Sequence, residues 1–177
     1  MENISHFKYA EQARSEKYTG VPYTKLDCQG FVEEVLKDCG VRKPDGTVYN
    51  WKGANSMWRN ALLWKGTIAE CLHTYGEIPP GAWVFIVAND GGEKEKGYND
   101  LEGNAKHVGI YVGGEEPVRD STRGSGRNGV GYRTIKAFTH VGLPFMIDFI
   151  DTNVLPNLDK AEALKALQTL KAYIERS

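Results

Sequence analysis

Residues 26–40, LDCQGFVEEVLKDCG, constrain the fold of this chain more than any other stretch. Asp27 is a residue type favoured at a helix N-cap, and Gly40 is one favoured just past a helix C-terminus. Between them, apolar side chains that share a face with Cys28 recur with the helical period, at Phe31, Val32, Val35, Leu36 and Cys39. The pattern predicts a helix that carries Cys28 in its first turn and buries one face.

The position of Cys28 has a chemical consequence. The first turn of a helix presents unpaired N–H groups and the positive end of the helix dipole, and both stabilise a thiolate. Cys28 is therefore a candidate nucleophile. Free cysteines are also common as small buried hydrophobic residues, and the position alone leaves both interpretations open.

A second stretch, KHVGIYVGG at residues 106–114, favours the interpretation of Cys28 as a nucleophile. It has the pattern of a strand that opens with His107 and ends in a turn at Gly113 and Gly114. A cysteine and a histidine held on two rigid elements can form a nucleophile and its general base.

Such a pair needs a third group to orient the imidazole. If Gly113 and Gly114 form the turn of a hairpin, Asp120 lies opposite His107; a four-residue loop over 113–116 would instead put Thr122 there. We favour Asp120, because a carboxylate accepts a ring proton and balances the charge of the imidazolium. A surface ion pair with a neighbouring arginine is the alternative for Asp120.

The motifs DCQGFVEEVL and HVGIYVGG resemble those of the NlpC-type family of papain-like cysteine peptidases. Cys28 precedes His107 by 79 positions (107 − 28 = 79), the order of the unpermuted members. The strand pattern at 118–122, VRDST, is similar to the family's V-I-H-A-S, with Asp120 in place of histidine. The resemblance implies an α+β, papain-like fold with N-terminal helices packed on a central antiparallel sheet. It also implies a Cys28–His107–Asp120 triad without metal or cofactor.

The resemblance further implies a substrate class, the stem peptides of peptidoglycan, cut between D-γ-glutamate and a diamino acid through a thioester acyl-enzyme. Tyr23, in the GVPY segment at 20–23, matches a tyrosine of the family's substrate groove. Asp27 and Gln29 flank the nucleophile, where the family uses aspartate and serine to bind the peptide. An amidase or acyltransferase acting on other amides, and a non-catalytic binding module, are the two alternatives.

Composition bounds the remaining possibilities. The net charge of −1 and the lack of a basic cluster argue against nucleic-acid binding. No apolar run approaches membrane-spanning length, and residues 1–20 lack the apolar core of a secretory signal. We therefore expect synthesis in the cytoplasm and delivery to the wall by another route, such as association with phage or prophage tail components. The three cysteines lack the spacing of a zinc site, and the oligomeric state stays open.

We expect one domain over residues 1–156, followed by an amphipathic helix over 157–177 that packs on the domain or docks elsewhere. Other predicted helices cover 5–17, with Phe7 on the buried face, and 55–64. A buried strand is predicted within 78–88 and closing strands at 132–135 and 145–150. Polar loops are predicted at 89–105 and, as a flexible Gly-rich segment, at 124–129. Trp51, Trp58 and Trp64 fit a core or groove wall better than a sugar-stacking platform.

Overall fold

Helix α2 (Cys28–Asp38) has Cys28 as its first residue in the computed structural model, which describes residues 3–88, 102–124 and 126–149. The Asp27 carboxylate accepts a hydrogen bond from the Gly30 N–H at 2.7 Å and caps the helix. Gly40, just past the C-terminal end, takes a left-handed conformation with φ of 76°. The predicted helix and both of its ends are confirmed.

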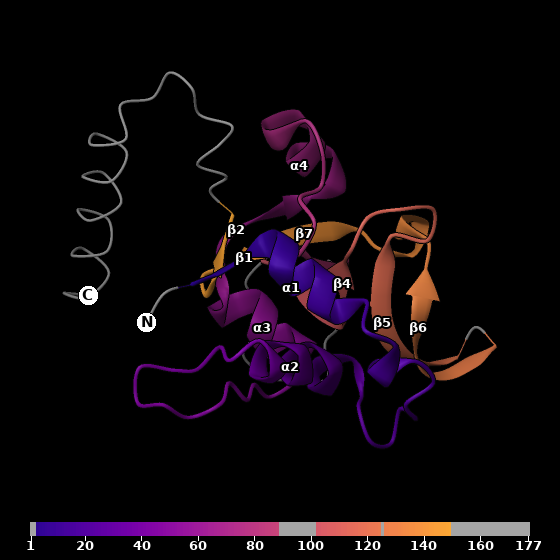
Figure 1. Cartoon of the computed structure of the whole chain (residues 1–177). Helices are drawn as coiled ribbons and strands as arrows, with labels where there is room; N and C mark the ends of the chain where they lie inside the picture. The colour runs from indigo at the N-terminus through magenta and orange to yellow at the C-terminus, as the bar shows by residue number, and fades with distance from the viewer. Residues whose placement is uncertain (1–2, 89–101, 125, 150–177) are drawn as a thin grey trace.

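A six-stranded antiparallel sheet forms the centre of the molecule (Figure 1). Its strands lie in the order β2 (Leu62–Thr67), β7 (His140–Pro144), β3 (Trp83–Ala88), β4 (Asn104–Tyr111), β5 (Val118–Gly124) and β6 (Arg127–Arg133). A separate parallel pair joins β1 (Ile4–Ser5) to β8 (Ile147–Asp148). The predicted α+β class is confirmed.

Side chains of β3 divide the core into two clusters. Trp83, Phe85 and Val87 belong to the larger cluster, which contains the buried faces of the N-terminal helices. Val84 belongs to the smaller cluster, which contains Cys71 of helix α4 (Ile68–Tyr75). Because alternate residues of a strand point to opposite faces, the two clusters lie on the two sides of the sheet. The predicted buried strand within 78–88 is confirmed.

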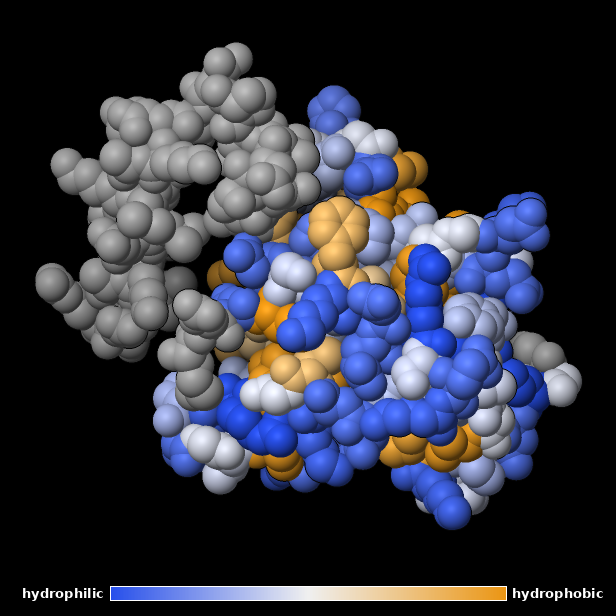
Figure 2. Space-filling model, viewed as in Figure 1, coloured by the Kyte–Doolittle hydropathy of each residue, from blue (hydrophilic) through white to orange (hydrophobic). Residues whose placement is uncertain are grey.

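Helix α1 (His6–Ala13) lies alongside α2, and a short 3-10 turn at Glu16–Tyr18 follows it. Its buried face is formed by His6, Tyr9, Ala10 and Ala13. The prediction that Phe7 lies on this face is wrong, because the Phe7 side chain is 55% exposed. Figure 2, drawn from the same side as Figure 1, shows a mainly hydrophilic surface with small separate apolar areas.

The predicted helix at 55–64 is correct only for its first half. Helix α3 (Ala54–Asn60) is capped at Gly53, and the chain then enters β2, whose residues pair with β7. Asn55 does not cap the helix; its side chain accepts from the Ala105 N–H at 3.0 Å and ties α3 to β4. Pairing with a strand distant in sequence thus overrides the local helical pattern. Trp58 is buried, as expected for a core tryptophan.

Several predicted segments differ from the structure or fall beyond it. Within the predicted flexible segment at 124–129, Gly124 pairs with Arg127, and residues 127–129 belong to β6. Strand β4 begins at Asn104, so it includes the last residues of the predicted loop at 89–105. Residues 89–101 and the predicted helix at 157–177 lie outside the described residues. A short 3-10 turn at Ile135–Ala137 leads from β6 towards β7.

Candidate active site

Cys28 lies at the start of α2, in contact with the larger core cluster and 9% exposed. Two N–H groups of the first turn are taken up by Asp27: its side chain accepts from Gly30, and its carbonyl accepts from Phe31 at 2.9 Å. The N–H groups of Cys28 and Gln29 are therefore the candidates to bind an anion at this helix end.

His107 lies on β4 and is held by a carboxylate from the next strand. Its Nε2 lies 2.6 Å from Oδ2 of Asp120, whose side chain is fully buried. Because the carboxylate can only accept, Nε2 carries the hydrogen of this bond. Nδ1 is then the ring nitrogen left to exchange a proton with another group.

The pairing of β4 with β5 differs from the predicted register. Ile110 pairs with Arg119 and Tyr111 with Val118, which is the register of the four-residue loop at 113–116. The prediction that Asp120 lies directly opposite His107 is therefore wrong. In this register Asp120 lies diagonally, on the same face as His107, and diagonal neighbours across a sheet are still within reach of long side chains.

Gly109 makes the diagonal contact possible. A Cβ at this position would lie 3.1 Å from the Asp120 Cβ and 2.7 Å from a Val118 methyl carbon. Without a side chain at Gly109, the carboxylate of Asp120 can cross to His107. The histidine and its carboxylate therefore meet despite the shifted register.

Two arginines that the sequence did not single out also contact Asp120. Arg133 Nη1 lies 3.0 Å from Oδ2, the oxygen that faces His107, and Arg127 Nη2 forms an ion pair with Oδ1. Both come from β6, where Asp120 pairs with Gly131. The sequence signal was available: in a tight hairpin at 124–127, Arg127 and Arg133 share a face with Asp120, separated by glycines at 129 and 131.

Gly131 opens the path for Arg127. A Cβ at Gly131 would lie 2.5 Å from Nη1 and 2.8 Å from Cδ of Arg127. The Arg127 side chain therefore runs over the glycine, donates to the Tyr132 carbonyl at 2.7 Å and reaches Asp120.

The surroundings of His107 and Asp120 favour the charged forms of both side chains, an imidazolium and a carboxylate. Burial lowers the pKa of His107, but hydrogen bonds to Asp120 and Cys28 and the charges of both outweigh it and raise this pKa to about 9. Burial raises the pKa of Asp120, but the hydrogen bonds from His107 and Arg133 and the charge of Arg127 hold that pKa below its ordinary value. The imidazole thus lies between the Cys28 thiol and an anionic carboxylate.

The segment that leads into Cys28 is fastened to the sheet by alternate residues of β5. Arg119, which is fully buried, donates to the Arg14 carbonyl at 3.3 Å and to the Thr19 hydroxyl at 2.7 Å. The Ser121 hydroxyl donates to the Leu26 carbonyl. Strand β5 therefore holds the nucleophile's segment with one set of residues and supplies Asp120 from the alternate set.

Tyr23 lies in the same neighbourhood as the candidate nucleophile. Burial raises the pKa of Tyr23, the charges of Cys28 and Asp27 raise it further, and Arg123 lowers it. The Arg123 guanidinium carbon lies 5.2 Å from the centroid of the Tyr23 ring. The structure thus brings Tyr23 near Cys28 and the exposed Asp27, and its role as a groove residue stays a prediction.

Gln29 is engaged by the protein itself. Its side-chain amide donates to Glu33 Oε1 at 2.8 Å and to the Trp51 carbonyl, and its oxygen accepts from the Gly53 N–H. These bonds use both amide hydrogens and hold the segment before α3 against α2. A substrate contact by Gln29 stays a prediction, and a substrate would have to compete with these partners.

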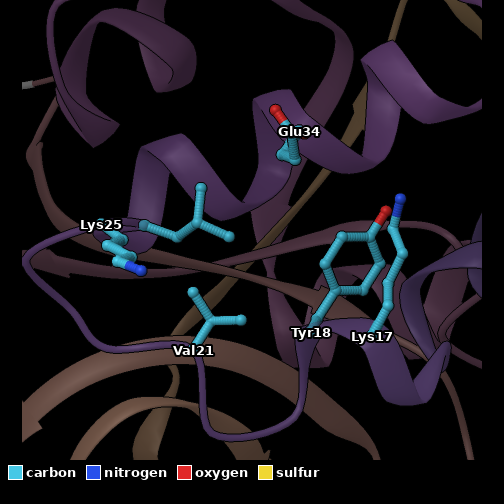
Figure 3. Close-up of a pocket in the computed structure, with 6 residues that line it drawn as sticks. Lys17, Tyr18, Val21, Lys25 and Glu34 are labelled. Atoms are coloured by element: carbon cyan, nitrogen blue, oxygen red, sulfur yellow. The ribbon is translucent and has the colours of Figure 1, made fainter.

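A hollow of about 340 Å³ is lined in part by the segment that precedes Cys28 (Figure 3). It is lined by Lys17, Tyr18, Val21, Lys25, Leu26 and Glu34. Neither Cys28 nor His107 lines it, so the hollow is separate from the candidate active site. Across the described ranges, no cluster of three or more His, Cys, Asp or Glu side chains could hold a metal ion.

Comparisons with known proteins give no relative. No protein-family model matches the chain, and neither a curated protein nor a solved structure matches it significantly. In the part of the chain that the structure describes, no helix has the length and apolar character needed to cross a membrane. The interpretation of the site therefore depends on its own geometry and on the resemblance of its motifs.

Proposed function

We propose that this protein is an NlpC-type, papain-like cysteine endopeptidase that hydrolyses amide bonds in peptidoglycan stem peptides. One observation carries the proposal. The imidazole of His107 accepts its orientation from the buried carboxylate of Asp120 and interacts with the thiol of Cys28 at a helix N-terminus. The same three residues are those that the motifs DCQGF and HVGIY and the following strand single out.

The first chemical step is attack by the thiolate. His107 accepts the proton of Cys28 on Nδ1, while Asp120 holds Nε2–H and stabilises the imidazolium. Sγ then forms a bond to the carbonyl carbon of the scissile amide. The oxyanion that develops is stabilised by the N–H groups at the start of α2, including that of Cys28.

The tetrahedral intermediate collapses as the C–N bond breaks, and the imidazolium gives its proton to the departing amine. A water molecule then gives a proton to His107 and adds to the thioester carbonyl. The C–S bond breaks, the acid is released, and the proton returns to the Cys28 thiolate. The cycle needs no oxidant, reductant or metal ion.

The substrate class comes from the family resemblance and from the charge next to the nucleophile. Asp27 and Tyr23 lie beside Cys28, where the resembled peptidases bind the amino end of a stem peptide. We propose cleavage between D-γ-glutamate and a diamino acid. In the bacterial setting this activity acts at the cell wall, and phage or prophage tail components are the proposed partners for delivery.

Digestion of purified peptidoglycan tests the proposal. The wild-type protein should release new amino groups, and mass spectrometry of the fragments should identify the cut bond. Cys28→Ser and His107→Ala should each reduce the release by at least about 100-fold, since general acid–base catalysis alone contributes roughly that much. Wall fragments unchanged by wild-type protein would contradict the proposal, and thioester formation with other amides would then favour an amidase or acyltransferase.

A further inference from the structure

Arg123 occupies a distinct place beside the candidate nucleophile. It belongs to the same alternate set of β5 residues as Arg119 and Ser121, which fasten the segment before Cys28. Unlike Arg119, which is buried, Arg123 is exposed. Its contact is with the face of Tyr23, at 5.2 Å from the ring centroid.

The charge of Arg123 has no carboxylate partner among the described residues. Within residues 3–88, 102–124 and 126–149, none of the ion pairs joins Arg123 to a carboxylate. By contrast, Arg127 and Arg133 of the same hairpin are both paired with Asp120. A guanidinium that rests on an aromatic ring keeps the N–H donors at its edge free to bind a planar anion.

Tyr23 connects Arg123 to the neighbourhood of the candidate nucleophile. The charges of Cys28 and Asp27 raise the pKa of Tyr23, and the charge of Arg123 lowers it. The nucleophile is therefore preceded by an exposed anion, Asp27, and lies near Tyr23, whose ring carries the exposed cation of Arg123. A substrate that carries both an amine and a carboxylate near its scissile bond is complementary to this pair of charges.

The chemistry of the proposed substrate supplies such a carboxylate. When glutamate is linked through its γ-carboxyl group, its α-carboxylate stays free on the acyl side of the bond to be cut. We infer that Arg123, held on the ring of Tyr23, binds this free carboxylate and so selects acyl groups that carry one. The inference rests on the proposed peptidase function and adds a specificity residue that the motifs do not include.

Two matched peptides test the inference: L-Ala-γ-D-Glu-diamino acid, and the same peptide with the glutamate α-carboxylate converted to a carboxamide. For the wild-type protein, kcat/KM should be about 10- to 100-fold higher for the carboxylate peptide, as expected for hydrogen bonds to a charged group. Arg123→Gln should abolish this preference by lowering kcat/KM for the carboxylate peptide. Arg123→Lys, which keeps the charge without the planar fork, should give an intermediate preference.

Binding to the Cys28→Ser variant gives a second readout that does not require turnover. Calorimetry should show tighter binding of the carboxylate peptide, and adding Arg123→Gln should remove the difference. Lys25→Gln is the control, because it removes the same charge from the nucleophile's segment and should keep the preference.

The outcomes separate the two proposals. If the wild-type protein cleaves both peptides equally, or if Lys25→Gln and Arg123→Gln act alike, the role of Arg123 is overturned while the peptidase function stands. An Arg123→Gln variant that melts at the wild-type temperature but loses activity equally on both peptides would also overturn it. If neither peptide is cleaved by wild-type protein or bound by Cys28→Ser, both proposals fail.

Discussion

The buried charge of Asp120 is balanced by three neighbours, His107, Arg127 and Arg133. A buried carboxylate without partners would be strongly destabilising, so at least part of this cluster is needed simply to keep Asp120 ionised. The two arginines therefore act on the imidazole indirectly, as positioning residues that fix the orientation and charge of its carboxylate.

Replacing Arg133 tests this indirect role. Arg133→Gln should raise the pKa of Asp120, because a hydrogen bond to the charged carboxylate is lost, and should destabilise the fold by about 1.5–3 kcal/mol. A carboxyl-carbon NMR titration and urea unfolding measure the two effects. Arg42→Gln is the control, since Arg42 donates to the backbone carbonyls of Lys37 and Val41; equal behaviour of the two variants would contradict the role of Arg133.

The three cysteines give an internal comparison of thiol reactivity. Burial raises the pKa of Cys39 and that of Cys71 to about 11, so both thiols should stay protonated near neutral pH. Cys28, whose thiol helps to raise the pKa of the His107 imidazole, should be alkylated first by iodoacetamide, and His107→Ala should slow its alkylation by about 10-fold or more. Peptide mapping by mass spectrometry resolves the three sites. Alkylation of Cys28 at a rate independent of His107 would show that the pair is not assembled.

At the scale of elements, the N-terminal segment and the β5–β6 hairpin form one unit. Gly20 donates to the Val130 carbonyl and Val130 donates to the Val21 carbonyl, each at 3.0 Å. The contact is so close that a Cβ at Gly129 would lie 2.2 Å from the Val21 oxygen. The hairpin thus supports Tyr23 and Cys28 from one side and provides Arg127 and Arg133 on the other.

Gly129→Ala should separate the segment from the hairpin. The clash with backbone, together with a φ of 136°, should cost at least about 2 kcal/mol of unfolding free energy and lower any Cys28-dependent activity. Gly126→Ala is the matched control: Gly126 also has positive φ, at 77°, but nothing lies within 4 Å of its added Cβ. Similar losses in the two variants, measured by urea unfolding, would mean that backbone strain rather than the contact explains the effect.

Local sequence patterns predicted the elements that carry the candidate site. The features that they did not predict depend on pairing between strands distant in sequence. Helix α2 and the part of strand β4 that carries His107 follow from capping, period and strand composition, which act within a few residues. The register of β5 and the arginine partners of Asp120 depend on the length of one loop and on a hairpin turn, which the pattern did not resolve. The second half of the predicted helix at 55–64 became β2 because β7 supplied a partner.

For the molecule as a whole, the stability of the two core clusters depends on pH through the charge of His107. Cys28 belongs to the larger cluster, while the His107 ring lies 5.9 Å from that of Phe138 in the smaller one. Protonation or deprotonation of His107 therefore changes the interactions between the helices and the sheet. Its effect should appear in global unfolding rather than in the fraying of one element.

Global stability should fall as the pH rises from about 6.5 to 9. The pKa of His107 is raised from 6.5 to about 9 on folding, so its contribution is complete below 6.5 and is lost as the pH passes through 9. At about 1.4 kcal/mol per pKa unit, the loss is on the order of 3 kcal/mol. The measurement is the unfolding free energy of wild type minus that of His107→Gln, from urea titrations across this range.

The half-buried imidazole of His140 supplies a control of opposite sign. Burial lowers the pKa of His140, so its contribution is present above 6.5 and is lost as the pH falls. His140→Gln should therefore remove a pH dependence of the unfolding free energy that lies below pH 6.5. His107→Gln should remove one that lies between pH 6.5 and 9. A difference between wild type and His107→Gln that stays constant from pH 6.5 to 9 would show that His107 titrates like a free imidazole. In that case neither the carboxylate of Asp120 nor the thiol of Cys28 would be acting on it, and the candidate triad would lose its electrostatic basis.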